Sequence, residues 1–180
     1  MSPRVTGMTR ILLGLAVLLL LSACTSDSSS GSPDGSGAEP DAQAVKAEMD
    51  AEAQTLLPAL VGRLGGRFNG MQATFFERGG FGIWDYTASG SLLKPSGTMT
   101  ESLAAVEDVL SQHGYAVETD DAQRRVTGTK GNVSVTAQAS LLSAEKKGSG
   151  LNVRMGVSGI QDGDDFAESA PAEDYLAYVQ

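Results

Sequence analysis

The spacing of the apolar residues changes from helical to alternating after His113-Gly114, and this change limits the fold more than any other feature. In two segments before it, apolar residues recur at the three- and four-residue spacing of helices that bury one face. After it they alternate with polar residues, which predicts strands with one apolar and one solvated face in an antiparallel sheet. The alternating series comprises Tyr115, Val117, Val126, Gly128, Val133, Val135, Ala137, Ala139, Leu151, Val153, Met155 and Val157.

The first predicted helix starts after Asp41, whose side chain suits an N-cap. Pro58 lacks a backbone donor and is expected to kink or restart this helix. Glycines at positions 62, 65 and 66 are expected to end it. Its apolar residues are Val45, Met49, Ala53, Leu56, Leu57, Leu60, Val61 and Leu64.

The second predicted helix begins at a capping box, with Thr98 as the cap and Glu101 three residues later. It ends at Gly114, which suits a left-handed stop. Its apolar residues are Leu103, Val106, Val109 and Leu110.

Two apolar helix faces and one apolar sheet face must cover each other. The sequence therefore predicts an α+β fold, an antiparallel meander with two main helices packed on one face as a two-layer sandwich. Earlier strands are expected over residues 71–78 and 83–88. We predict a single domain over residues 40–180 with an acidic C-terminal tail, in which residues 171–180 form a short amphipathic helix. Its apolar side is Tyr175, Leu176, Tyr178 and Val179.

The N-terminus has the layout of a secretory signal peptide. Arg4 and Arg10 give it positive charge, and the apolar run 11–21 is short for a membrane span. The run ends in Leu21-Ser22-Ala23-Cys24, which resembles the lipobox of bacterial lipoproteins. The resemblance implies cleavage of residues 1–23, lipidation of Cys24, and anchoring to the bilayer on the extracytoplasmic face of the cell membrane. Met8 is an alternative start to Met1.

Residues 24–39 are expected to be the lipidated cysteine and a disordered tether rich in Ser and Gly. Cys24 is the only cysteine, so the domain is expected to be stable without a disulfide. Loss of Arg4 and Arg10 leaves 11 of the 13 basic residues beside 22 acidic ones, and the formal charge goes from −9 to −11. A surface with this negative charge repels the phosphate groups of nucleic acid, so we expect no nucleic-acid partner.

No motif in the sequence supports catalysis, and we expect neither an enzyme, a metal site nor a cofactor. The single histidine, His113, stands where a helix C-terminus favours a cation, which is a structural position. The acidic stretch 162–165 lacks the later carboxylate and central glycine of a calcium loop, so a solvated turn is expected.

Five of the chain's ten aromatic residues lie within a dozen positions: Phe75, Phe76, Phe81, Trp84 and Tyr86. Core packing is the simpler interpretation, but the adjacent Phe75 and Phe76 must face opposite sides of a strand. Phe76 is then either covered by residues 171–180, the interpretation we favour, or used for binding. The candidate binding surface is Phe76, Phe81, Trp84 and Tyr86.

The chain is similar to small lipoproteins of high-GC Gram-positive bacteria in three successive segments. These are the stretch 83–90, a capped helix that ends at His113-Gly114-Tyr115, and a Val-rich meander. This resemblance transfers no catalytic residue. The leading hypothesis is a non-enzymatic envelope module that binds a protein or cell-wall partner through the solvated sheet face and the Phe81–Tyr86 loop. The alternative is a carrier that holds a lipid or other apolar ligand between helices and sheet.

Overall fold

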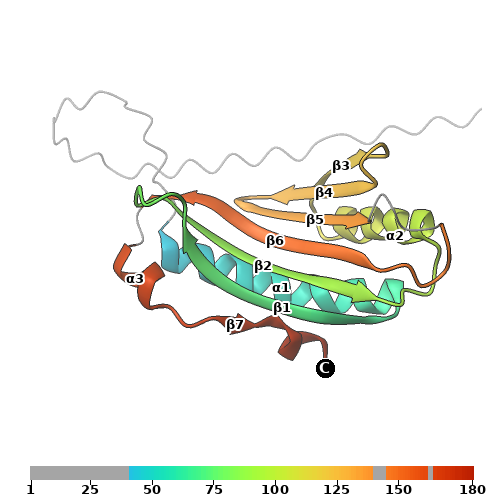
Figure 1. Ribbon diagram of the computed structural model, residues 1–180, viewed down its shortest axis with the longest axis horizontal. Helices are drawn as coiled ribbons and strands as arrows, with labels where there is room; N and C mark the ends of the chain where they lie inside the picture. Colours follow the sequence, from blue (N-terminus) through green and yellow to red (C-terminus); the bar gives the residue numbers. More distant parts are fainter. Residues whose placement is uncertain (1–40, 140–144, 162–163) are drawn as a thin grey trace, which may run out of the picture. The chain divides into compact units, whose positions relative to one another are not determined.

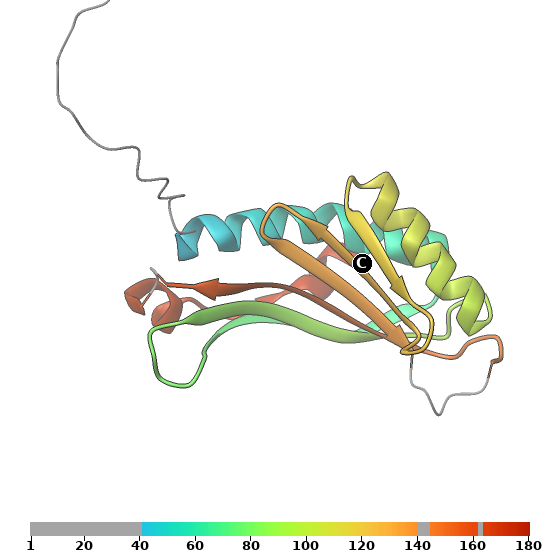
Figure 2. The ribbon, with the colours of Figure 1, turned by 90° about the horizontal axis from the view of Figure 1, so that it is seen from above.

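A computed structural model describes residues 41–139, 145–161 and 164–180. This part of the chain forms one antiparallel sheet with its two main helices on the same face (Figure 1, Figure 2). The predicted α+β two-layer fold is confirmed. The predicted signal peptide, Cys24 and the predicted tether all lie outside the described residues.

The first half of the described chain contains α1 (Ala42–Leu64), β1 (Arg67–Glu77), β2 (Trp84–Leu93) and α2 (Met99–Gln112). The second half contains β3 (Ala116–Asp120), β4 (Arg125–Lys130), β5 (Val133–Ala139), β6 (Leu151–Ile160), α3 (Asp164–Ser169), β7 (Glu173–Asp174) and a 3-10 helix, η1 (Tyr175–Val179). The two early strands are longer than predicted, because polar and glycine residues at their ends still pair with neighbouring strands.

The seven strands lie in the order β3-β4-β5-β6-β2-β1-β7. The predicted meander is confirmed from β3 to β6, where each strand pairs with the next along the chain. The hairpin of β1 and β2 then joins this meander through β2, which pairs with β6. The early hairpin thus extends the sheet, and residues far apart in sequence share one surface.

Helix α1 begins as predicted, since the Asp41 carboxylate accepts a hydrogen bond from the backbone N–H of Gln43. The predicted restart at Pro58 is wrong, because the helix runs without interruption to Leu64. Pro58 lies on the exposed side, where water can bond the carbonyl group that proline leaves unpaired. Gly62 likewise lies within the helix, and Gly65 follows it as the C-cap.

Helix α2 has the predicted capping box, in which Thr98 and Glu101 each accept a hydrogen bond from the other's backbone N–H. After His113, Gly114 adopts a φ of 82°, the left-handed conformation expected of a helix stop. Three of the four predicted apolar residues are buried, but Leu103 is only half-buried at the edge of the helix's inner face.

The core fills the space between the helices and the inner sheet face. The alternation is confirmed in β5, where Val133, Val135, Ala137 and Ala139 are buried, and in β6, where Leu151, Val153, Met155 and Val157 are buried. From α1, buried residues at helical spacing face them, among them Met49, Leu56 and Leu60. The sheet therefore has one covered face and one open face.

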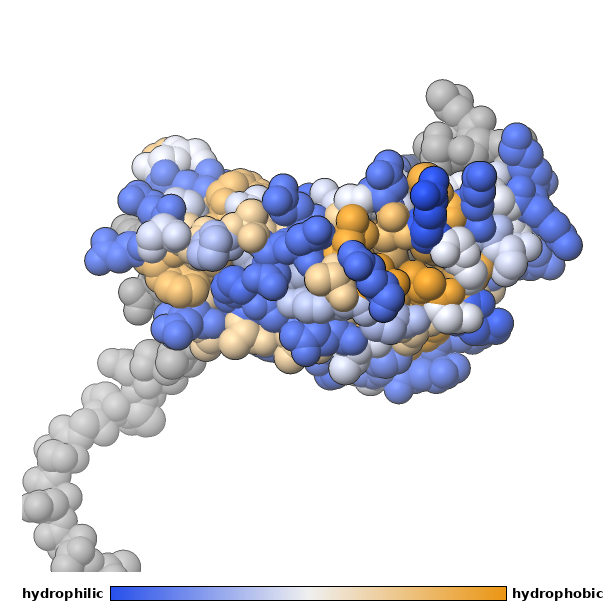
Figure 3. Space-filling view, turned by 90° about the horizontal axis from the view of Figure 1, so that it is seen from below, coloured by the Kyte–Doolittle hydropathy of each residue, from blue (hydrophilic) through white to orange (hydrophobic). Residues whose placement is uncertain are grey.

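The C-terminal segment differs from the prediction. Residues 171–180 form the two-residue strand β7 and the 3-10 helix η1, not an amphipathic α-helix. They pack against α1 and the β1 edge, so they do not cover Phe76 on the open face, and the interpretation that we favoured is wrong. Figure 3 shows apolar surface gathered over this segment. Leu176, Tyr178 and Val179 are its partly buried apolar residues.

A polar network fixes this segment to α1. The Tyr175 hydroxyl donates to Asp50 Oδ1 at 2.6 Å, and the Tyr86 hydroxyl donates to the same oxygen at 3.2 Å. Lys46 Nζ lies 2.5 Å from Asp50 Oδ2 and 3.5 Å from Glu173 Oε2. Burial raises the pKa of Tyr86 to about 12, so its hydroxyl remains a donor at neutral pH.

Candidate functional site

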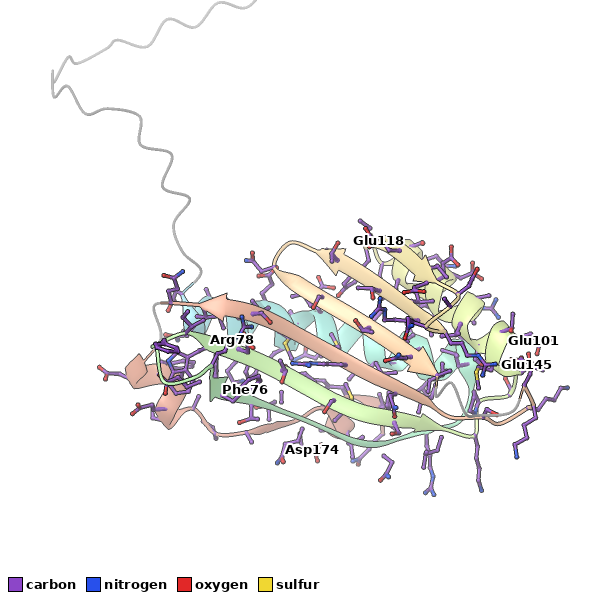
Figure 4. The ribbon with its side chains drawn as sticks, turned by 45° about the horizontal axis from the view of Figure 1, so that its top comes forward. Phe76, Arg78, Glu101, Glu118, Glu145 and Asp174 are labelled. Atoms are coloured by element: carbon purple, nitrogen blue, oxygen red, sulfur yellow. The ribbon has the colours of Figure 1, made fainter. Side chains whose placement is uncertain are left out.

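The open face of the sheet carries polar side chains (Figure 4). Strand register places residues of six strands in one row: Gln72, Ser89, Arg154, Thr136, Thr127 and Glu118. The next row contains Ser91, Asn152, Gln138, Arg125 and Asp120. Neighbours in a row stand about 4.8 Å apart, and successive rows about 7 Å apart. Together they present hydroxyl, amide and guanidinium groups at regular spacing.

The middle of this face is an open hollow of about 510 Å³, which we call the polar hollow. Its lining comes from β2, β4, β5 and β6. The lining residues are Ser89, Gly90, Ser91, Arg125, Thr127, Thr136, Gln138, Asn152, Val153 and Arg154. Three further surface hollows in the described part of the chain are lined mainly by polar residues too.

The two arginines of the polar hollow differ in how they are held. Arg125 Nη2 lies 3.1 Å from Asp120 Oδ2, an ion pair at the rim of the hollow. Arg154 has an exposed side chain between Ser89 and Thr136 and makes no ion pair with the residues described. Its guanidinium group is therefore free to bind an anion, to which it can donate two parallel hydrogen bonds.

Several hydroxyl and amide groups of the hollow already contact each other. The Thr127 and Thr136 hydroxyl oxygens are 3.4 Å apart, and the Ser91 hydroxyl donates to Asn152 Oδ1 at 3.0 Å. These contacts orient the side chains while leaving donors and acceptors available at the surface. The floor of the hollow is thus polar and partly preorganised.

A second feature of the open face lies at the end of the sheet near Phe76 and Arg78 (Figure 4). Asp85 pairs with Phe76 across the strands, yet it is only 4% exposed. Its two carboxylate oxygens each accept from Arg78 Nη2 at 2.7 Å. Oδ1 also accepts from the Gly159 N–H at 3.0 Å, at a bulge where β6 carries one extra residue. This carboxylate holds the bulge in place.

The electrostatics of Asp85 follow from these contacts. Burial acts to raise the pKa of its carboxyl group, but the hydrogen bonds from Arg78 and Gly159 outweigh burial, and the pKa lies below its usual value. A carboxyl group with a lowered pKa in the folded state stabilises the protein above its unfolded pKa, near 3.9. That contribution is lost as the pH falls through the folded-state pKa.

We therefore expect Asp85→Asn to lower the free energy of unfolding at pH 7 by about 1–3 kcal/mol, because a charge-assisted contact is lost in a buried place. The difference from wild type should shrink as the pH falls from about 4 toward the folded-state pKa of Asp85, because the carboxyl group of the unfolded chain binds its proton first. Urea unfolding at pH 7 and pH 3 measures both effects. Asp108→Asn is the matched control, since Asp108 forms an exposed pair with Arg63. A constant difference at both pH values would contradict the assignment.

The structure divides the predicted aromatic surface into two groups. Trp84 and Tyr86 are 7% and 0% exposed, so their assignment to a binding surface is wrong. They face the core beside Phe75, whose ring centroid lies 4.3 Å from that of Tyr86. Phe76 and Phe81 are 40% and 81% exposed and are the large exposed apolar residues of the described chain. Strand parity places Phe76 on the face opposite Phe75, because alternate residues face opposite sides, whereas Phe81 is exposed because it lies in the loop between β1 and β2.

Groups typical of catalysis are sparse in the part of the chain described. His113 is the C-cap of α2 and is half-buried. Among the residues placed by the structure, no three His, Cys, Asp or Glu side chains are grouped so as to hold a metal ion. Residues 162 and 163 of the acidic stretch lie outside this set, and α3 begins at Asp164.

Alternation with Val153 and Met155 places Arg154 on the solvated face, but the sequence does not identify the polar hollow. Only the pairing of β6 with both β2 and β5 brings its lining together. Comparison with protein-family models, curated proteins and solved structures found no match. Within the described residues, the helices are too short or too polar to cross a membrane.

Proposed function

We propose that this chain is a lipid-anchored, extracytoplasmic and non-enzymatic module of the cell envelope, and that its polar hollow binds an anionic, hydroxyl-rich cell-wall polymer. The observation that carries the proposal is Arg154, which has no ion-pair partner among the described residues and lies in the middle of a polar sheet face that none of the described helices covers. The Leu21–Cys24 motif supports the anchor, because acylated Cys24 would hold the chain at the bilayer.

The lining of the hollow favours a hydroxylated polymer over a protein partner. Protein interfaces have cores that are enriched in aromatic residues, and the lining of the hollow contains none. Serine, threonine, asparagine and glutamine side chains instead match the hydroxyl groups of a glycan, and Arg154 matches a carboxylate or phosphate group. The same lining contains no carboxylate or imidazole that would serve as a general base, which supports a binding role over a catalytic one.

The carrier hypothesis has less support. A lipid carrier needs an apolar hollow between helices and sheet. The polar hollow and the three further hollows described above are open at the surface, and each has polar residues in its lining. We therefore place the ligand on the open face of the sheet.

The test is to titrate the mature chain with an oligogalacturonate and with a neutral malto-oligosaccharide of equal length. We expect Arg154→Gln to weaken binding of the carboxylated ligand about 10-fold or more, because a charge-assisted hydrogen bond contributes about 1.5–3 kcal/mol. Added salt should weaken binding as well. Arg63→Gln is the control, since Arg63 lies on α1, away from the open face.

Isothermal titration calorimetry measures these affinities. If both variants bind as tightly as wild type, or if the neutral ligand is preferred, the polar hollow is not an anion-binding site. Loss of binding in Arg63→Gln alone would place the ligand on the helical face.

A further inference from the structure

The loop between β1 and β2, residues 78–83, presents Phe81 to solvent with little around it. Three glycines flank Phe81, and Gly79, Gly80 and Gly82 have φ values of 70°, 73° and 68°. Residues other than glycine rarely adopt this backbone conformation. Glycine therefore fills these three positions, and the loop has few side chains that could shield the Phe81 ring. Phe81 is 81% exposed, and the other large exposed apolar residue, Phe76, stands at the end of β1 that leads into the loop.

The charged groups at the base of this loop are already hydrogen-bonded. The Glu77 carboxylate accepts from the Gly82 N–H at 2.8 Å, and Arg78 is held by Asp85. The Arg78 N–H donates to the Ile83 carbonyl at 2.6 Å and closes the loop. The backbone N–H groups of Arg78 and Gly82 would therefore keep their hydrogen-bond partners if the tip moved into a less polar medium.

The loop lies at the end of the domain where α1 begins, as both ribbon views show (Figure 1, Figure 2). Under the anchor proposed above, 17 residues lead from Cys24 to Asp41, immediately before α1. A chain of that length spans at most roughly 60 Å even when fully extended. The Phe81 end of the domain is thus the end held closest to the lipid, and tethering raises its effective concentration at the bilayer.

We propose that the tip formed by residues 78–83 contacts the outer surface of the bilayer, with the Phe81 ring at the boundary between headgroups and acyl chains. A single ring gives weak attachment by itself, but the lipid anchor holds the domain near the surface, and the contact then selects an orientation. The open sheet face would then be parallel to the membrane normal, where polymers of the cell wall can reach it. This inference rests on the lipid anchor of the proposed function.

The test uses the mature lipidated chain in phosphatidylcholine vesicles whose acyl chains are brominated. Phe81→Trp places an indole at the tip, while wild type contains only the buried Trp84 as a background. The control is Ala122→Trp, in the exposed turn between β3 and β4 at the opposite end of the sheet. We expect the indole of Phe81→Trp to be quenched at least about threefold more than that of Ala122→Trp, since bromine reaches only groups within the interface.

The outcomes separate the tip from the anchor. Co-flotation of the protein with vesicles reports the anchor, and quenching reports the tip. If the protein does not float, the anchored-module proposal fails and the tip proposal fails with it. If it floats but Phe81→Trp is quenched no more than Ala122→Trp, the tip proposal alone is overturned. Shielding of the indole that depends on protein concentration and not on lipid would assign Phe81 to a contact between two copies, and would also overturn it.

The acidic surface near the tip predicts a dependence on lipid charge. Glu77 and the α3 residues Asp165 and Glu168 lie at the same end and are exposed. Replacing part of the phosphatidylcholine by phosphatidylglycerol should reduce the quenching of Phe81→Trp at low salt, and added salt should restore it. Stronger quenching on anionic vesicles would mean that Arg78, rather than Phe81, directs the contact.

Discussion

Tyr175→Ala is expected to lower the free energy of unfolding by about 3–5 kcal/mol, because it removes a fully buried aromatic side chain. The ring stacks on Tyr178 with centroids 5.2 Å apart, and the hydroxyl donates to Asp50. Without the Tyr175 side chain, Asp50 loses the shorter of its two hydrogen bonds from tyrosine hydroxyl groups, and η1 loses its one buried side chain. Burial raises the pKa of Tyr175, so the hydroxyl acts as a donor at neutral pH.

Two further variants separate packing from hydrogen bonding in this effect. Tyr175→Phe keeps the ring and should cost about 1–2 kcal/mol, the value of one buried hydrogen bond. Tyr178→Phe removes a half-buried hydroxyl that lies 3.4 Å from Glu173 Oε1 and should cost little. Chemical unfolding measures all three. If Tyr175→Ala were no more destabilising than Tyr178→Phe, the C-terminal segment would not be packed on α1.

Under the proposed lipid anchor, Cys24→Ser is expected to abolish membrane attachment completely, since acylation would require the cysteine sulfur. Each buried methylene contributes about 0.8 kcal/mol, so two acyl chains make attachment effectively permanent, and the loss should be all-or-none. The domain should still fold, because Cys24 lies outside the described core. Mass spectrometry of the mature N-terminus and fractionation of cells measure modification and attachment.

Thr25→Ser is the matched control for this experiment, because it changes the neighbouring residue and leaves the four-residue motif intact. It should be lipidated and found in the membrane fraction. An unmodified N-terminus at another residue in the wild-type chain would end the lipoprotein proposal, whereas the polar hollow would still be open to its own test.

The sequence by itself determined the features that depend on neighbours along the chain. The cap at Asp41, the capping box at Thr98 and Glu101, and the stop at Gly114 are local hydrogen-bonding or backbone preferences, and all are present. Alternation correctly divided β5 and β6 into inner and outer residues, because consecutive side chains on a strand must face opposite sides. It also separated the buried Phe75 from the exposed Phe76.

Only the tertiary structure decided which distant segments meet. The pairing of β2 with β6 brings Ser89 beside Arg154 and so forms the polar hollow. Packing of the C-terminal segment on α1 left Phe76 open and joined Tyr86 to Tyr175 and Asp50. Neither arrangement has a local signal, since strand order and the position of a terminal segment follow from the total surface buried between elements far apart in sequence.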